Sequence, residues 1–309
     1  MKIAIDIGYG HTKVMTEDGV FKIPSAIALN KTTIGSENNS LSFEGKNYIV
    51  GEDATRNAIK TRDYAFIYKY APLIIYHVFE TLGKLDDIST AEISTGLSLY
   101  DIAKAPEFDS TCKNRAEEFI KRVKQFTINN NQYTPEIKLF AQGQGVWQDY
   151  CLSNGYLDKG YEVVVDIGYR TNDVIIFKDG RADKSDSNAD DKGINEIVTQ
   201  LKTQLNKKYD INFTEQEVNE ILKDKVLFFN GVEKDVSETI NEIVDGYIET
   251  LMSSLKADYS DVLKISRRVI ISGGGAYILN EYKDMFPANV VFDEKQEYEF
   301  ANVRGYYNG

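Results

Sequence analysis

The sequence predicts the α/β fold class, with two domains that each contain a mixed β-sheet flanked by helices. The chain has 309 residues, of which 42% are hydrophobic, and this is enough apolar surface for two cores of about 150 residues each. One segment near the start recurs 160 residues later, because the stretch around Asp6 matches the stretch around Asp166. After each copy, strand patterns alternate with helix patterns, which is typical of sheets covered by helices.

The repeated segment predicts a β-hairpin at the start of each half. Aligned without gaps, the two copies read KIAIDIGYGHTKVM (2–15) and EVVVDIGYRTNDVI (162–175), and they share Asp-Ile-Gly-Tyr and the apolar positions before it. A second turn signal follows each copy, at Asp18-Gly19 and at Asp179-Gly180. Each half is therefore expected to open with a three-stranded meander.

The rest of each half mixes strands and helices. Strands are predicted at 93–99, 131–140 and 267–272, and helices at 110–126, 143–155, 193–208, 214–224, 237–257 and 278–286. A further hairpin is predicted at 226–236, with its turn at Asn230-Gly231. We expect a first domain at 1–157, with an inserted subdomain at about 30–60, and a second domain at 158–299. A terminal helix at 300–309 is expected to pack back on the first domain.

Charge and composition exclude several classes of protein. The chain has 36 Lys and Arg against 48 Asp and Glu, a formal net charge of −12, which disfavours direct binding to the DNA backbone. No run of 18 apolar residues and no basic, then apolar, leader is found, so we expect neither a membrane span nor a secretion signal. Cys112 and Cys151 form no CxxC pair, which excludes a disulfide framework or structural zinc and favours the cytoplasm.

The turn of the first hairpin has the residues of a phosphate-binding loop. Gly8 and Gly10 let the backbone approach a ligand closely and present consecutive N–H groups to phosphate oxygens. Lys13 follows as a compact cation, and Asp6 ends an apolar strand where a carboxylate needs a balancing charge such as a hydrated Mg²⁺. The alternative is an Asp-capped turn with a surface lysine. The nucleotide-binding residues predicted in this turn are Gly8, Tyr9, Gly10, His11, Thr12 and Lys13.

Two further segments complete the predicted site. The second hairpin would face the first if the halves pack about a pseudo-twofold axis, and Asp6 and Asp166 would then converge on one metal ion. A glycine cluster between a strand and a helix, which begins at Gly273, lets a base or ribose lie against the backbone, although a flexible turn is the alternative. The nucleotide-binding residues predicted in these segments are Gly168, Tyr169, Arg170, Thr171, Asp173, Gly193, Gly273, Gly274, Gly275 and Ala276.

Five segments, in order and spacing, resemble the motifs of a known superfamily. IDIGYGHTKV, AQGQGVWQDY, VVVDIGYRTNDV, VIISGGGAYIL and EFANVRGYYNG are similar to the phosphate-1, connect-1, phosphate-2, adenosine and connect-2 motifs of the actin, heat-shock-chaperone and sugar-kinase superfamily. Within it, the chain looks most like the plasmid-segregation actins of the ParM/StbA type and the archaeal actin-like proteins. The resemblance implies a duplicated actin-type fold with an interdomain nucleotide cleft, binding of ATP, ADP and Mg²⁺, and self-association into head-to-tail filaments. A DNA-binding adaptor would link such filaments to a plasmid.

The resemblance also assigns roles to individual residues. At connect-1 the bacterial plasmid proteins usually carry Glu, whereas this chain has Gln142, as actin and the archaeal relatives do; an amide can orient water for in-line attack but is no strong base. The expected catalytic residues are Gln142, Asp166 and Asp6, with both aspartates on Mg²⁺ through water. Glu217 and Glu220 lie on a helix that flanks the base in the family, or on an ordinary solvated helix face.

Two other functions of the same superfamily stay open. A small-molecule kinase would bind an acceptor in the same cleft, and a non-polymerising chaperone or reactivating ATPase would not form filaments. The sequence shows no clear acceptor-binding constellation and no appended substrate-binding domain. These observations favour an ATPase that hydrolyses ATP on polymerisation, and the resemblance implies plasmid segregation as its purpose.

Overall fold

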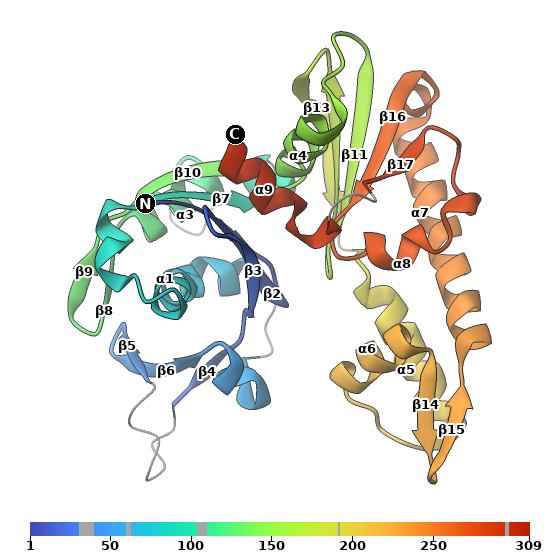
Figure 1. Cartoon of the computed structure of the whole chain (residues 1–309), viewed down its shortest axis with the longest axis horizontal. Helices are drawn as coiled ribbons and strands as arrows, with labels where there is room; N and C mark the ends of the chain where they lie inside the picture. Colours follow the sequence, from blue (N-terminus) through green and yellow to red (C-terminus); the bar gives the residue numbers. More distant parts are fainter. Residues whose placement is uncertain (31–39, 60–62, 104–109, 191, 294–296) are drawn as a thin grey trace.

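The computed structural model describes residues 1–30, 40–59, 63–103, 110–190, 192–293 and 297–309, and it contains two five-stranded mixed sheets (Figure 1). The first sheet has the order β10-β7-β1-β2-β3 and the second β13-β12-β11-β16-β17. The strands of the first are β1 (Lys2–Ile7), β2 (His11–Thr16), β3 (Gly19–Pro24), β7 (Glu92–Leu97) and β10 (Glu136–Ala141). Those of the second are β11 (Tyr161–Ile167), β12 (Asn172–Lys178), β13 (Arg181–Asp190), β16 (Ser266–Ser272) and β17 (Val290–Phe292).

The sequence repeat is a structural repeat. In each sheet an antiparallel meander pairs its first strand with a strand parallel to it, β1 with β7 and β11 with β16. Asp6 lies opposite Lys13 across the first hairpin, and Asp166 lies opposite Asp173 across the second. The two predicted meanders and the α/β fold class are thus confirmed.

Each sheet buries one face in its own domain core, because alternate side chains of a strand point to the same face. In the first sheet, β1 packs on α1 (Tyr64–Thr81), with α3 (Arg115–Lys124) in the same core. In the second, β11 packs on α7 (Ser237–Ile265), with α5 (Asn195–Tyr209) beside it. Asp6 and Asp166 lie at the strand positions that alternate with these core residues, so they face away from the cores.

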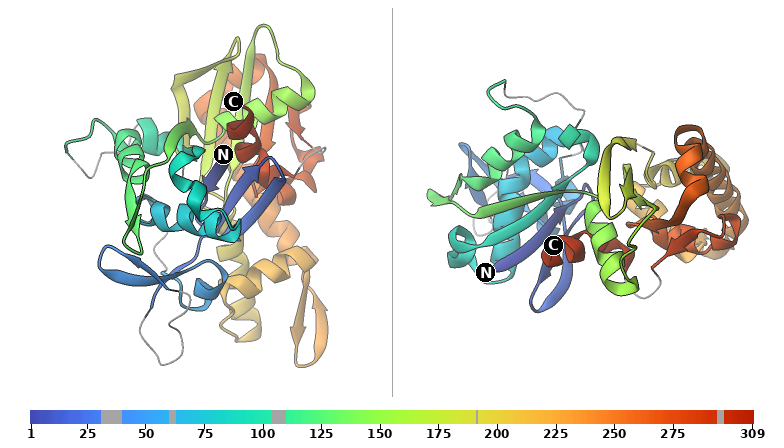
Figure 2. Two further views of the ribbon diagram at one scale, coloured as in Figure 1. Left: turned by 60° about the vertical axis from the view of Figure 1, so that its left-hand side comes forward. Right: turned by 90° about the horizontal axis from the view of Figure 1, so that it is seen from above.

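The other faces of the two sheets are covered by α4 (Gln144–Asn154) and α9 (Ala301–Asn308), which lie between the sheets in green and red in Figure 2. Helix α4 packs Trp147 on Phe177 of the second sheet, with ring centroids 4.4 Å apart. Helix α9 packs Val303 and Tyr306 on β1. The two helices cross so closely that a Cβ at Gly305 would lie 1.9 Å from a backbone oxygen of α4.

Several predicted boundaries need correction. The helix predicted at 110–126 begins only at Arg115, because the side chain of Asn114 accepts the N–H of Glu117 (2.9 Å) and caps it. The strand predicted at 131–140 is two strands, β9 (Asn131–Tyr133) and β10, separated by Thr134 and Pro135.

The second domain departs from prediction at two helices, α7 and α8. The helix predicted at 237–257 is α7, which runs on to Ile265 with a non-helical residue at Tyr259 (φ −131°). The helix predicted at 278–286 is shorter and earlier, as α8 (Ala276–Asn280), followed by a 3-10 turn (Lys283–Met285). The predicted hairpin is confirmed as β14 (Val226–Phe229) and β15 (Val232–Asp235), and α6 (Glu215–Asp224) precedes it.

Shorter elements fill the periphery. The segment predicted as an inserted subdomain forms a small sheet of β4 (Ile27–Leu29), β5 (Leu41–Phe43) and β6 (Lys46–Val50), while residues 31–39 and 60 lie outside the described residues. Helix α2 (Leu99–Ala103) and strand β8 (Phe126–Ile128) complete the first domain, with 3-10 turns at Glu52–Asn57, Leu85–Thr90 and Tyr298–Phe300. Among the described helices, none has both the length and the apolar content to cross a membrane.

Candidate functional site

The turns of the two hairpins lie against each other. The guanidinium of Arg170, in the second turn, lies 5.8 Å from the ring centre of Tyr9, in the first. Each turn closes with a backbone hydrogen bond, from Gly8 N to Asp6 O (3.1 Å) and from Gly168 N to the carbonyl of residue 171 (2.8 Å). The repeated sequence therefore brings both glycine turns to one place, where the ends of β1 and β11 meet.

Asp6 is held by two groups on the first domain. It is only 4% exposed, and the amide Nε2 of Gln142 donates to its Oδ1 at 2.9 Å. Lys13 Nζ lies 3.9 Å from its Oδ2. The sequence had assigned Gln142, Asp6 and Lys13 separate roles, and the structure joins them in one network.

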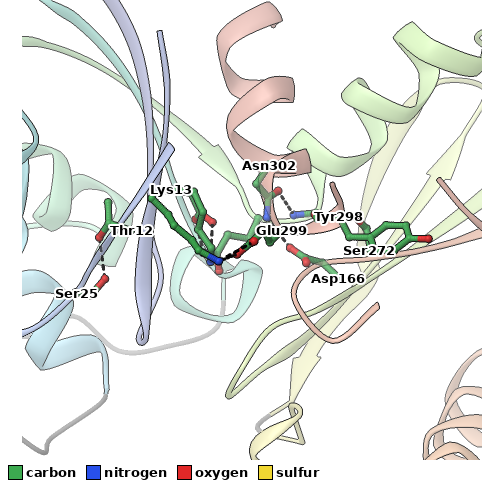
Figure 3. A network of polar contacts seen from close by, with 12 residues as sticks. Thr12, Lys13, Ser25, Asp166, Ser272, Tyr298, Glu299 and Asn302 are labelled. Atoms are coloured by element: carbon green, nitrogen blue, oxygen red, sulfur yellow. Dashed lines mark hydrogen bonds and ion pairs between the residues drawn. The ribbon is translucent and has the colours of Figure 1, made fainter. Parts of the chain in front are cut away.

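Asp166 is the counterpart on the second domain. Its Oδ2 accepts a hydrogen bond from Asn302 Nδ2 at 2.6 Å (Figure 3). The pKa of Asp166 is raised to about 6, chiefly by burial and in part by the negative charge of Asp6, while the hydrogen bond from Asn302 and the charge of Lys13 oppose the rise. The carboxylates of the two repeats thus act on each other electrostatically across the domain boundary.

Asn302 was not predicted, and it links α9 to both neighbours. While its amide donates to Asp166, its Oδ1 accepts the N–H of Gly143, at the start of α4, at 2.9 Å. Asn302 is 7% exposed. The closing motif had been recognised as a whole, but no local signal marks one amide within it as the partner of a carboxylate 136 residues away in the chain.

Asp173 is held by the other domain. Leu99 N, at the start of α2, donates to Asp173 Oδ1 at 3.1 Å, and the hydroxyl of Thr171 donates to Oδ2 at 3.3 Å. Burial raises the pKa of Asp173 well above its usual range, and the charge of Asp166 adds to this shift. The sequence gives no signal that the backbone N–H of Leu99 contacts Asp173.

Thr12 and His11 were both predicted to bind nucleotide, and the structure shows the direction of the first side chain and the surroundings of the second. The side chain of Thr12 is fully buried, and its hydroxyl pairs with that of Ser25 at 2.8 Å (Figure 3). The residue opposite Asp6 is Lys13, so Thr12 does not face Asp6. The reason is strand alternation, because Thr12 is adjacent to Lys13 and must point to the other face. His11 stays near the surface of the turn, and burial followed by the charge of Lys22 lowers its pKa, which favours the neutral ring at pH 7.

The other predicted glycines pack the turns together. Gly273 has φ +85°, and a Cβ there would lie 2.4 Å from Oδ1 of Asp166. Gly275 N donates to Ile167 O at 2.8 Å, which fixes this loop beside β11 and leads into Ala276 at the start of α8. Gly193 N donates to Arg170 O at 2.9 Å, beneath the turn that also contains Tyr169. Among the described residues, apart from the adjacent residues of the chain, no heavy atom lies within 4 Å of a Cβ placed on Gly274 or on Gly10.

The two glutamates of α6 have local partners. Glu217 accepts hydrogen bonds from Thr214 N and Oγ1, both at 2.7 Å, as the second half of a capping box. Glu220 accepts from Gln216 Nε2 at 3.3 Å. Both side chains are exposed, so the structure gives them helix roles and their contact with a base stays a prediction.

The donor set suits a hydrated Mg²⁺ better than a metal held by protein ligands alone. No cluster of three or more His, Cys, Asp or Glu within the described ranges could hold a metal. The negative charge of Asp6 does act on the carboxyl of Asp166 and raises its pKa. Mg²⁺ keeps several waters while it binds one or two carboxylates and phosphate oxygens. These residues fit a magnesium ion delivered with a nucleotide.

The chain is similar to known proteins in both sequence and fold. Residues 4–145 match the family model "Actin like proteins N terminal domain", and residues 164–283 match "Archaeal actin homologue MreB-like, C-terminal". The archaeal actin homolog of Thermoplasma volcanium is 26% identical over 98% of this chain and 97% of its own length. The crystal structure of an archaeal actin homolog superposes with a TM-score of 0.81 at 20% identity, over 99% of this chain and 98% of that chain.

This chain has the actin-like ATPase fold. Two further solved structures share this fold. An archaeal actin homolog in complex with ADP superposes with a TM-score of 0.76 at 20% identity, over 99% of this chain and 98% of that chain. A 15-stranded ParM filament from Clostridium botulinum superposes with a TM-score of 0.75 at 21% identity, over 99% of this chain and 97% of that chain.

Proposed function

We propose that this actin-like protein binds ATP between the two hairpin turns and assembles head to tail into filaments that hydrolyse it. The observation that supports the proposal most directly is the convergence of two glycine turns, each with a buried carboxylate beside it, at one place between the domains. A ligand bound there contacts both domains at once. Its binding free energy therefore favours the arrangement in which the domains are held together.

The residues of the site have three roles in this proposal: binding phosphate, holding magnesium and orienting water. Lys13 and the N–H groups of the turns bind phosphate oxygens, and Lys13 is already oriented by Asp6. Magnesium, when bound with the nucleotide, neutralises phosphate charge, and the carboxylates of Asp6 and Asp166 would hold it through water. Gln142, whose Nε2 is fixed by Asp6, presents its side-chain oxygen to orient an attacking water.

Proteins of the same fold support both parts of the proposal, assembly and nucleotide binding. A ParM of the same fold forms a filament, and an archaeal homolog binds ADP. A net charge of −12 disfavours direct binding to DNA, so a plasmid-segregating filament of this chain would work in the cytoplasm through a DNA-binding adaptor protein. A kinase or a non-polymerising reactivase of the same fold remains the competing function.

Assembly and chemistry can be measured together. Light scattering of the pure protein should rise above a critical concentration when Mg-ATP is added, and phosphate release should follow the rise. A protein that stays monomeric at micromolar concentrations while it transfers phosphate to a small molecule would establish the kinase instead. Release of phosphate without assembly would favour the reactivase.

A further inference from the structure

Tyr306, in α9, carries a fully buried hydroxyl that makes no hydrogen bond within the part of the chain that the structure describes. Its ring is stacked on Phe140, with ring centroids 5.2 Å apart, so packing holds the side chain in place. A buried hydroxyl that gives up its hydrogen bonds to water on folding costs free energy. Such a group calls for an explanation, and a partner that it meets only in another state of the protein supplies one.

The hydroxyl of Tyr306 lies beside the strand next to Asp6. A Cβ placed on Gly96, in β7, would lie 2.1 Å from the hydroxyl oxygen. Strands β1 and β7 are parallel and pair Ile5 with Thr95, so the same register brings Asp6 beside Gly96 on the face that α9 covers. Burial, and then the charges of Asp6 and two further aspartates of the site, raise the pKa of Tyr306 and keep its hydroxyl a donor.

Helix α9 already provides one donor to the site. Asn302 and Tyr306 are four residues apart, so they lie on one face of the helix, and long helical side chains lean toward the N-terminus. The amide of Asn302 donates to Asp166, the carboxylate of the second repeat, at 2.6 Å (Figure 3). The hydroxyl of Tyr306 has the corresponding place beside Asp6, the carboxylate of the first repeat.

The two oxygens of Asp6 are engaged by different groups in the structure. Oδ1 accepts the amide of Gln142 at 2.9 Å, whereas Oδ2 has only the ammonium of Lys13, at 3.9 Å. The second contact is longer than a hydrogen bond, and the ammonium group of a lysine also binds phosphate. A triphosphate that draws Lys13 away leaves Oδ2 of a buried carboxylate in need of another donor.

We propose that the Tyr306 hydroxyl donates to Asp6 when Lys13 turns to the phosphates of a bound nucleotide. Tyr306 is then a positioning residue, because it orients the Asp6 carboxylate toward the hydrated metal after the lysine has left it. The exchange also links the site to α9, the helix that contacts Asp166 of the other domain. This inference rests on the proposed function for the arrival of the phosphates, but the contact between Tyr306 and Asp6 can be measured without nucleotide.

Lys13→Met imitates the departure of the lysine and tests the contact by itself. Without nucleotide, Tyr306→Phe alone should leave the stability unchanged or higher, because the hydroxyl has no partner among the described residues. In the Lys13→Met background, the same change should raise the equilibrium constant for unfolding by about tenfold or more, because it removes a hydrogen bond to a charged group. Urea titrations of the four proteins at pH 8 measure both effects.

Tyr307→Phe is the matched control. It removes a hydroxyl from the next residue of α9, whose ring lies 4.9 Å from Lys2 Nζ on a different side of the helix. Its effect on stability should be the same with Lys13 and with Met at that position. Calorimetric titration gives the second readout, in which Tyr306→Phe should weaken binding of Mg-ATP by about tenfold and Tyr307→Phe should leave it at the wild-type value.

The outcomes separate this inference from the proposed function. Equal effects of Tyr306→Phe in the two backgrounds overturn the contact with Asp6, whether or not the protein binds nucleotide. A clear loss of stability from Tyr306→Phe alone also overturns it, because the hydroxyl then has a partner while Lys13 is in place. Wild-type affinity of Tyr306→Phe for Mg-ATP overturns the exchange. Wild-type protein that binds no Mg-ATP, while the two backgrounds still differ, overturns the proposed function and leaves the contact.

Discussion

Replacing Asp166 by Asn removes a negative charge from the buried side of the candidate site and preserves the shape of the side chain. Burial raises the pKa of Asp166 to about 6 from its usual 3.8, which means that the folded protein binds this proton more tightly than the unfolded chain does. Ionisation of Asp166 therefore costs the folded state free energy. The shift of about 2 pKa units corresponds to about 3 kcal/mol.

The sign of the pH dependence follows directly. Below pH 3.8 the carboxyl is neutral in both states and the cost is absent; it grows as the pH rises and is complete above about pH 6. The Asp166→Asn protein lacks this cost. Its advantage over wild type in free energy of unfolding should therefore grow by up to about 3 kcal/mol between pH 4 and pH 7.

Urea unfolding without nucleotide, at several values of pH, measures this difference. The same variant should lose most of the thermal stabilisation that Mg-ATP gives wild type, because one carboxylate for the hydrated metal is gone. Asp166→Asn would then be more stable alone and less responsive to ligand. A stability difference that stays flat across this range of pH would refute the electrostatic reasoning, and unchanged stabilisation by Mg-ATP would refute the metal role.

Three further substitutions probe neighbouring contacts. Gln142→Ala removes the amide held by Asp6, and filaments should still form. Single-turnover phosphate release should slow by about 10- to 1,000-fold, which corresponds to a barrier change of about 1.4–4 kcal/mol. A wild-type rate would show that Gln142 has no part in the mechanism. Arg304→Met leaves Asp149 buried without the guanidinium that donates to it at 2.9 and 3.0 Å, and should lower the free energy of unfolding by about 3–5 kcal/mol in urea titrations; a change under about 1 kcal/mol would contradict this. Tyr306→Phe removes a fully buried hydroxyl that has no hydrogen-bond partner among the described residues. The variant should therefore be as stable as wild type, or more stable by about 1–3 kcal/mol in free energy of unfolding. A clear loss of stability would show that the hydroxyl is hydrogen-bonded.

The parts of the site that could be predicted from sequence are those encoded locally. The Asp-Ile-Gly-Tyr repeat reveals both hairpins, because a strand, a glycine turn and a second strand are set by neighbouring residues. Cross-strand register then places Lys13 opposite Asp6 and Asp173 opposite Asp166. Strand alternation was also available from sequence, and it would have shown that Thr12 points away from Lys13.

Contacts made by distant segments could not be predicted in the same way. Asn302 reaches Asp166 only because α9 crosses α4 at a pair of glycines and enters between the sheets. The pairing of Gln142 with Asp6 likewise joins residues 136 positions apart. The sequence pattern indicates that the glycine at 273 makes room for a ligand, whereas the structure shows that close packing on Asp166 already requires it. A sequence pattern can indicate that a position requires glycine, but it does not show which atoms lie close to that position.

In the proposed function, a nucleotide bound between the two hairpin turns drives head-to-tail assembly. Sedimentation of the pure protein, with negative-stain microscopy of the pellet, tests it most directly when run with Mg-ATP, with Mg-ADP and without nucleotide. We expect filaments in the Mg-ATP pellet and monomers in the supernatant without nucleotide. Monomers in all three samples at tens of micromolar protein, or filaments that form equally well without nucleotide, would contradict it.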